Sequence, residues 1–147
     1  MSHIKKETVK GFDDVHPQVL AEGIRVAGQL LALQGVKVTD HILDWGGSKV
    51  TRFNELDVIV GLDSQGKASS GKFSGMGLAV DSEGKFAVVG DFYYDEQKKR
   101  RDELRKQLEQ VLGGACYFAA RAMIAQAKGK KTEIKVNDGQ LQLVVQM

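Results

Sequence analysis

The spacing of apolar residues changes twice along this 147-residue chain, and this limits the possible folds more than any other feature. Residues 13–35 repeat apolar side chains every three to four positions, which is typical of a helix with one buried face. From residue 36 to residue 94 they tend to alternate, as in the strands of a sheet. Residues 95–128 return to the helical period, and Gly113-Gly114 predict a bend or a break there.

The first helix is expected to be capped by Asp13 or Asp14, with Pro17 in its first turn. Gly23 and Gly28 lie inside this helix, where each costs up to about 1 kcal/mol relative to alanine. Two interpretations are open for these glycines. They allow close contact with a ligand, or they allow close packing of the backbone on a sheet, which we favour.

Short strands are predicted throughout the middle of the chain, at residues 36–38, 42–45, 50–52, 56–62, 73–80 and 86–94. Residues 62–67 and 80–85 share the order apolar-Asp-Ser-x-Gly-Lys, which predicts a hairpin turn at each place. Residues 2–10 predict one more strand. Its lysines place it at an edge of the sheet, because charged side chains discourage unwanted pairing there.

Asn137-Asp138-Gly139 is the strongest hairpin signal, between strands expected at 132–136 and 141–145. The order of elements is therefore strand, helix, meander, helix and hairpin. Only antiparallel strands can be joined by such short connections. The sequence predicts a single α+β domain over residues 1–147, with a mainly antiparallel sheet and two helices packed on one face.

Composition excludes several classes of protein. Hydrophobic residues make up 42% and charged residues 27%, which are values for a globular chain. One cysteine cannot form an internal disulfide, so we expect a cytoplasmic protein. No apolar run approaches the length of about 18 residues that a spanning helix needs, and no signal peptide is expected. A net charge of +2 does not indicate nucleic acid by itself, and nothing points to DNA.

No motif carries a recognisable chemistry. Residues 61–67 match the spacing of a phosphate-binding loop, but Ala68 stands where a hydroxyl must reach magnesium, and no helix is expected to follow. The three histidines and Cys116 do not have the spacing of a zinc site. We expect no cofactor, no metal and no enzyme, while a catalytic site assembled only by folding is left open.

The charged run at residues 98–106 carries the candidate binding residues. Its acid-first pairs four residues apart are typical of a solvated helix. Arg101 does not fit, because it lies in line with the apolar Leu104 and Leu108. Either the helix overhangs the sheet at its start, which we favour, or Arg101 faces a partner. Aromatic residues precede the run, and the candidate set is Phe92, Tyr93, Tyr94, Lys98, Arg101 and Arg105.

The chain resembles an uncharacterised family of small proteins, a domain of unknown function found in cyanobacteria, algal plastids and other bacteria. The likeness lies in the opening Met1-Ser2-His3, in residues 77–92 ending Gly90-Asp91-Phe92, and in the hairpin at 132–145. The chain departs from the family at Ile4, where an aromatic is usual, in its longer first helix, and in lacking a terminal tryptophan. The resemblance implies the fold, no catalytic residues, and an accessory or adaptor role beside ATPases of the AAA+ class.

Two functions remain as hypotheses. The first is a non-enzymatic adaptor that binds a protein partner, either an AAA+ ATPase or a second copy of itself. The second is a module that binds single-stranded RNA, because aromatic faces beside Lys and Arg suit that ligand. The second would use Phe92, Tyr93, Tyr94 and the basic start of the following helix.

Overall fold

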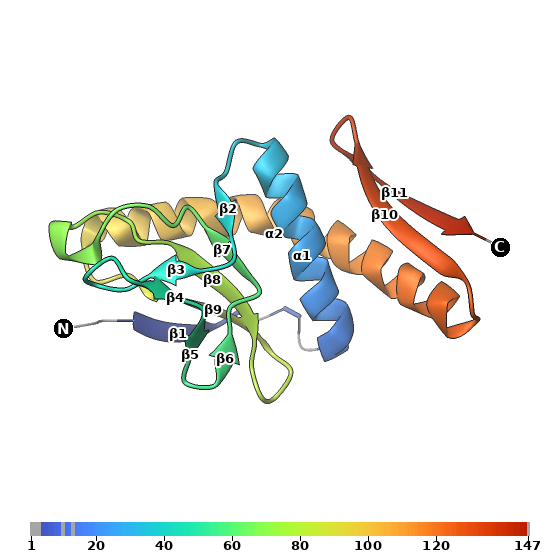
Figure 1. Cartoon of the computed structure of the whole chain (residues 1–147), viewed down its shortest axis with the longest axis horizontal. Helices are drawn as coiled ribbons and strands as arrows, with labels where there is room; N and C mark the ends of the chain where they lie inside the picture. The colour runs from blue at the N-terminus through green and yellow to red at the C-terminus, as the bar shows by residue number, and fades with distance from the viewer. Residues whose placement is uncertain (1–3, 10, 13, 147) are drawn as a thin grey trace.

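The structure is a computed structural model that describes residues 4–9, 11–12 and 14–146 (Figure 1). Two helices, α1 and α2, alternate with a strand-rich middle and a final hairpin. The elements are β1 (Ile4–Thr8), α1 (Pro17–Leu33), β2 (Val38–Thr39), β3 (Ile42–Leu43), β4 (Lys49–Val50), β5 (Arg52–Phe53), β6 (Leu56–Asp57), β7 (Val60–Leu62), the 3₁₀ turn η1 (Ala68–Ser70), β8 (Met76–Val80), β9 (Phe86–Asp91), α2 (Asp95–Ala127), β10 (Lys131–Asn137) and β11 (Gln140–Gln146).

The main sheet has five antiparallel strands in the order β1-β9-β8-β7-β2. On one face Leu78 and Val88 stand opposite each other and are fully buried. They share the main core with Leu20 and Ile24 of α1 and Leu104 of α2. Both helices therefore cover the same face, and the predicted α+β fold with a mainly antiparallel sheet is confirmed.

A second, smaller core lies on the opposite face. Ala79 and Val89 of the sheet pack there with Ile42 and Leu56, all of them buried. Ile42 and Leu56 come from two small hairpins, β3–β4 and β5–β6. Their strands are shorter than the strands predicted for these residues. With the helices on one face and the hairpins on the other, both faces of the sheet are covered.

Helix α2 continues without a break through Gly113 and Gly114, so the predicted break is wrong. It extends past the sheet and crosses α1 (Figure 1). At α1, His16 forms the cap and its ring nitrogen accepts a hydrogen bond from the Gln18 amide. The prediction of Asp14 as the cap is therefore wrong, and Asp13 lies outside the described residues. No described helix is long and apolar enough to cross a membrane.

The two segments with the order Asp-Ser-x-Gly-Lys behave differently. Residues 80–85 form the predicted hairpin turn between β8 and β9, where Asp81 accepts hydrogen bonds from the amides of Glu83 and Lys85. Residues 62–67 begin the long connection between β7 and β8, which pair antiparallel, so the second hairpin forms but the predicted tight turn at 62–67 is wrong. Strand β1 pairs at the sheet edge as predicted, while Ser2, His3 and Lys10 lie outside the described residues.

The C-terminal hairpin β10–β11 forms a separate two-stranded sheet over the helices (Figure 1). Its turn has positive φ at both Asp138 and Gly139, as the Asp-Gly signal predicts. Directly opposed residues share a face. One face therefore carries Thr132, Ile134, Val136, Leu141, Leu143 and Val145, and this face is apolar apart from the threonine.

Candidate functional site

The predicted aromatic residues lie at the junction of β9 and α2. Asp91 ends β9, is almost fully buried, and accepts a hydrogen bond from the Tyr93 amide at 3.4 Å. Tyr94 is the residue before α2, and its amide donates to the Gln97 side chain at 2.9 Å. Gln97 is itself buried and donates to the carbonyl of Lys72 at 3.0 Å. These bonds fix the direction in which the chain enters α2.

Arg101 is covered by its own chain. Its Nη1 lies 2.9 Å from a carboxylate oxygen of Glu7 in β1, and its side chain is only 17% exposed. The guanidinium stands 5.1 Å from the centre of the Phe92 ring, within cation–π distance. Arg105 reaches the same Glu7 at 3.8 Å. Neither interpretation of Arg101 describes this arrangement, because the helix start is held against the sheet edge by an ion pair across 94 residues.

A small cavity of about 140 Å³ brings four of the six candidate residues together. The Tyr93 side chain is 58% exposed and its ring packs edge-on against Tyr94. Tyr94 and Arg105 are not part of the cavity wall. Three of the lining residues are basic and one is acidic, which suits an anion; they are Lys5, Glu7, Phe92, Tyr93, Lys98 and Arg101.

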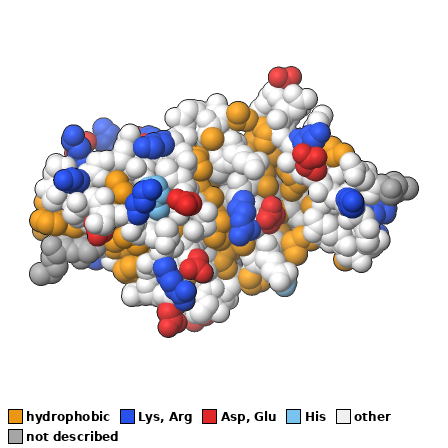
Figure 2. Space-filling view, in the orientation of Figure 1, with side chains coloured by type: hydrophobic (Ala, Val, Ile, Leu, Met, Phe, Trp, Pro, Cys, Tyr) orange, Lys and Arg blue, Asp and Glu red, His pale blue; other side chains and the backbone are white. Residues whose placement is uncertain are grey.

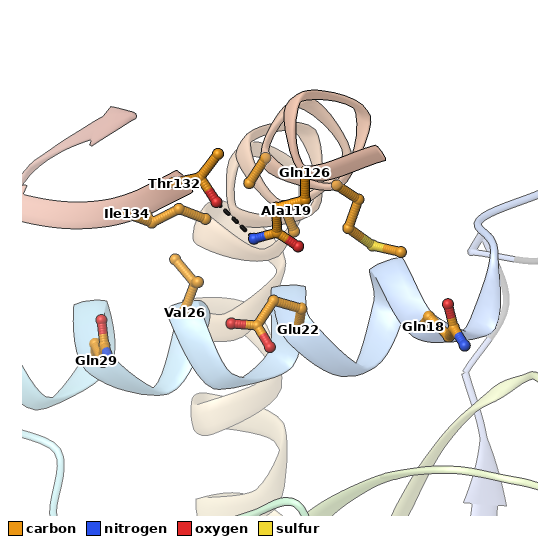
Figure 3. Close-up of a pocket in the computed structure, with 10 residues that line it drawn as sticks. Gln18, Glu22, Val26, Gln29, Ala119, Gln126, Thr132 and Ile134 are labelled. Atoms are coloured by element: carbon orange, nitrogen blue, oxygen red, sulfur yellow. Dashed lines mark hydrogen bonds between the residues drawn. The ribbon is translucent and has the colours of Figure 1, made fainter. Parts of the chain in front are cut away.

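Two larger grooves, which the sequence did not predict, lie where the hairpin meets the helices. The first has a volume of about 390 Å³ (Figure 3). Val26 of α1 and Ile134 of β10 both line it. Gln126 of α2 donates a hydrogen bond to the Thr132 hydroxyl across its upper wall, so this groove is partly polar.

The second groove, of about 400 Å³, lies between the end of α1, the middle of α2 and the hairpin turn. None of its lining residues is charged. Leu33 at its rim is 63% exposed, although leucine ordinarily favours burial. Its walls are Leu30, Leu33, Gln34, Gln110, Val111, Gly114, Phe118, Gly139, Gln140 and Leu141, and we call it the apolar groove.

Hydrophobic side chains also reach the surface near these grooves. Figure 2 shows hydrophobic side chains gathered in the strip between α1 and the hairpin. None of the six side chains on the inner face of the hairpin is fully buried. The available signal was the width of the apolar face of α1, because Leu30 and Leu33 lie beside the residues of that helix that enter the main core. An apolar helix face that is wider than its contact with the core needs a second surface to cover the remainder.

The other sequence candidates do not assemble a chemical site. In the loop that resembles a phosphate-binding motif, Asp63 has φ of 55° and its carboxylate pairs with Arg100 at 2.9 Å. Only a three-residue 3₁₀ turn follows this loop. His41 lies 2.8 Å from Asp40, and this hydrogen bond helps to hold the pKa of the Asp40 carboxyl below its usual value. Among the described residues, no three His, Cys, Asp or Glu side chains are grouped to hold a metal.

Known proteins offer no guide to these surfaces. No protein-family model, no curated protein and no solved structure matches the chain.

Proposed function

We propose that this protein is a non-enzymatic accessory or adaptor protein that binds a protein partner in the apolar groove. The observation that carries the proposal is the exposed Leu33 at the rim of a groove whose lining residues have no charge. A groove that exposes apolar side chains and carries no charge is a surface that a protein partner can cover. An apolar face of a partner helix or loop could fill the groove, with Gln34, Gln110 and Gln140 offering hydrogen bonds at its rim.

The partner class follows from the resemblance and is part of the same proposal. An AAA+ ATPase is the first partner to test, and a second copy of the chain is the other. The location that goes with the proposal is the cytoplasm, and it rests on cysteine usage alone.

The experiment is affinity capture of the tagged protein from its native lysate, with and without nuclease. The proposal predicts a protein partner that survives nuclease and is lost from Leu33→Glu. The matched control is Ile124→Glu, because Ile124 is equally exposed on α2 but lies outside the apolar groove. Recovery of the same partner by the Leu33→Glu variant would contradict the proposal.

A second candidate function is favoured by the cavity at the start of α2. Lys5, Lys98 and Arg101 lie around it beside the exposed Tyr93 ring, an arrangement that suits a phosphate and a stacked base of single-stranded RNA. This function predicts salt-sensitive binding of an RNA oligonucleotide that weakens in Tyr93→Ala. Lysate recovery that disappears with nuclease would favour RNA over a protein partner.

A further inference from the structure

The outer edge of strand β11 is a long, uncharged and unpaired sheet edge. The hairpin contains two strands only, so β11 pairs with β10 on one side and with no described strand on the other. In Figure 1 it is the outer strand of the hairpin, away from the main sheet. All seven residues of β11, QLQLVVQ, are uncharged and none is proline.

Other sheet edges in the described chain lack this combination. Strand β1, at one edge of the main sheet, carries Lys5, Lys6 and Glu7 in five residues. Strand β2, at the other edge, is only two residues long. Charged side chains and short length are both common protection against edge-to-edge pairing. Strand β11 has neither protection, so its edge is open to another strand.

The register of the hairpin identifies which backbone groups point outward. A two-residue turn closes on a hydrogen-bonded pair, here Asn137 and Gln140, and hydrogen-bonded pairs then alternate along the ladder. Leu141, Leu143 and Val145 fall on the alternate positions. Their amides and carbonyls therefore face away from β10, giving three donors and three acceptors on the open edge.

We propose that two copies of this chain join by antiparallel pairing of β11 with β11 about a twofold axis at Leu143. Leu143 then stands opposite its own copy, and Leu141 stands opposite Val145. Each of these three pairs exchanges two hydrogen bonds, so all twelve outward groups of the two edges are satisfied. The same register joins the apolar faces of both hairpins into one four-stranded surface.

The outer face of the hairpin is compatible with the same pairing. Gln142 stands opposite Val144 of the second copy, and Gln140 stands opposite Gln146. No like charges meet across the axis, since β11 has no charged residue. An isologous contact of this kind closes at two copies, so it predicts a dimer and no larger assembly. This inference goes beyond the proposed function, because it is argued from the backbone edge of β11 and not from the apolar groove.

The experiment measures the mass in solution by light scattering during size exclusion, over a range of protein concentrations. The wild type is expected at twice 16.1 kDa. Gln142→Lys with Val144→Lys places positive charges directly opposite each other and is expected to give a monomer. Gln142→Glu with Val144→Lys places opposite charges together across the axis, and also opposite Lys135 and Glu133 within each hairpin, so this mixed-charge variant is expected to restore the dimer. Both positions lie on the polar face of the hairpin, so folding should persist, and circular dichroism checks this.

The matched control is Glu133→Lys, which adds the same two units of positive charge to the same face but in β10. This control should remain a dimer.

A monomeric wild type, an assembly larger than a dimer, or a dimer that persists in the double-lysine variant would overturn the pairing. Failure of the mixed-charge variant to restore the dimer would overturn the register. A monomeric wild type would reject this inference. If the Leu33→Glu variant still lost its partner, the proposed function would stand.

Discussion

Gly23 of α1 lies directly against Cys116 of α2 where the two helices cross. A Cβ added to Gly23 would stand 2.5 Å from the Cys116 sulfur and 3.1 Å from its Cα. The first distance is shorter than real Cβ contacts allow, and the second involves backbone that cannot rotate away. Gly28 lies further along the same helix, and a Cβ added there would stand 3.1 Å from a methyl group of Val60 in β7. The predicted close packing on a sheet is therefore confirmed for Gly28, whereas for Gly23 it is wrong, because Gly23 packs closely on the other helix.

Gly23→Ala is expected to destabilise the protein by about 1–3 kcal/mol, because the helices must move apart to admit one methyl group. Denaturant unfolding measures this loss. Adding Cys116→Ala removes the sulfur contact but leaves the backbone contact, so it should recover part of the loss. A Gly23→Ala variant as stable as the wild type would mean that the helices do not cross this closely.

Gly114→Ala is expected to have the opposite effect. Gly114 lies in the middle of α2, and a Cβ there would meet no atom within 4 Å. Alanine should therefore stabilise the helix by about 0.5–1 kcal/mol, since glycine loses more backbone freedom on folding. The same unfolding measurement checks this, with Gly23→Ala as the comparison. A loss of stability would show that α2 is not a continuous helix at Gly114.

Asp81 is expected to make stability depend on pH. Its side chain is 6% exposed, and burial acts to raise the pKa of the carboxyl. The amide hydrogen bonds from Lys85 and Glu83 and the charge of Lys6 outweigh burial, so the pKa lies below its ordinary value of 3.8. A lowered pKa stabilises the fold above the ordinary value, and this stabilisation is lost as the pH falls through the folded pKa.

Asp81→Asn should therefore cost about 1 kcal/mol at pH 7, because the amide hydrogen bonds lose a charged acceptor. The difference from wild type should shrink as the pH falls below 3.8. Urea unfolding of both proteins at pH 7 and at pH 3 measures it. A difference that stays constant between these two pH values would contradict the role assigned to the ionised carboxylate.

The Arg101–Glu7 pair is expected to fasten the start of α2 to β1. Arg101→Ala and Glu7→Ala should each destabilise, and a double-mutant cycle should give a coupling of about 1 kcal/mol, since the pair is charged and partly shielded. The nearby Lys98→Ala supplies a control, because the Lys98 side chain makes no hydrogen bond or ion pair with the other residues that the structure describes. Additive effects of Arg101→Ala and Glu7→Ala would mean that the two side chains do not interact.

Local patterns predicted most of the elements but not their contacts. The helices, the edge strand and the Asp138-Gly139 turn each follow from residues close together in sequence. The break predicted between the strands at 50–52 and 56–62 coincides with the turn between β5 and β6, but its type was not predicted: Asn54 and Glu55 both have positive φ, and glutamate there gives no turn signal. Strands β7 and β8 pair as a hairpin, but the tight turn expected at 62–67 is replaced by a long loop, in which Asp63 pairs with Arg100, 37 residues away.

The candidate sites were likewise predicted only where they depend on residues close together in sequence. The order of Phe92, Tyr93, Lys98 and Arg101 along one segment was enough to predict that they lie near each other. Glu7 could not be assigned to them, since nothing in the sequence specifies pairing between residues 94 positions apart. The apolar groove was missed for the same reason. It forms from α1, α2 and the hairpin turn, and only their packing shows that Leu33 is left uncovered.

The most direct test of protein binding in the apolar groove is a calorimetric titration of the purified partner into three proteins. These are the wild type, Leu33→Glu and Ile124→Glu. Burial of one leucine is worth about 1.5–3 kcal/mol, so Leu33→Glu should weaken binding at least tenfold, while Ile124→Glu should bind like the wild type. Equal affinity of the wild type and Leu33→Glu would contradict the proposed function.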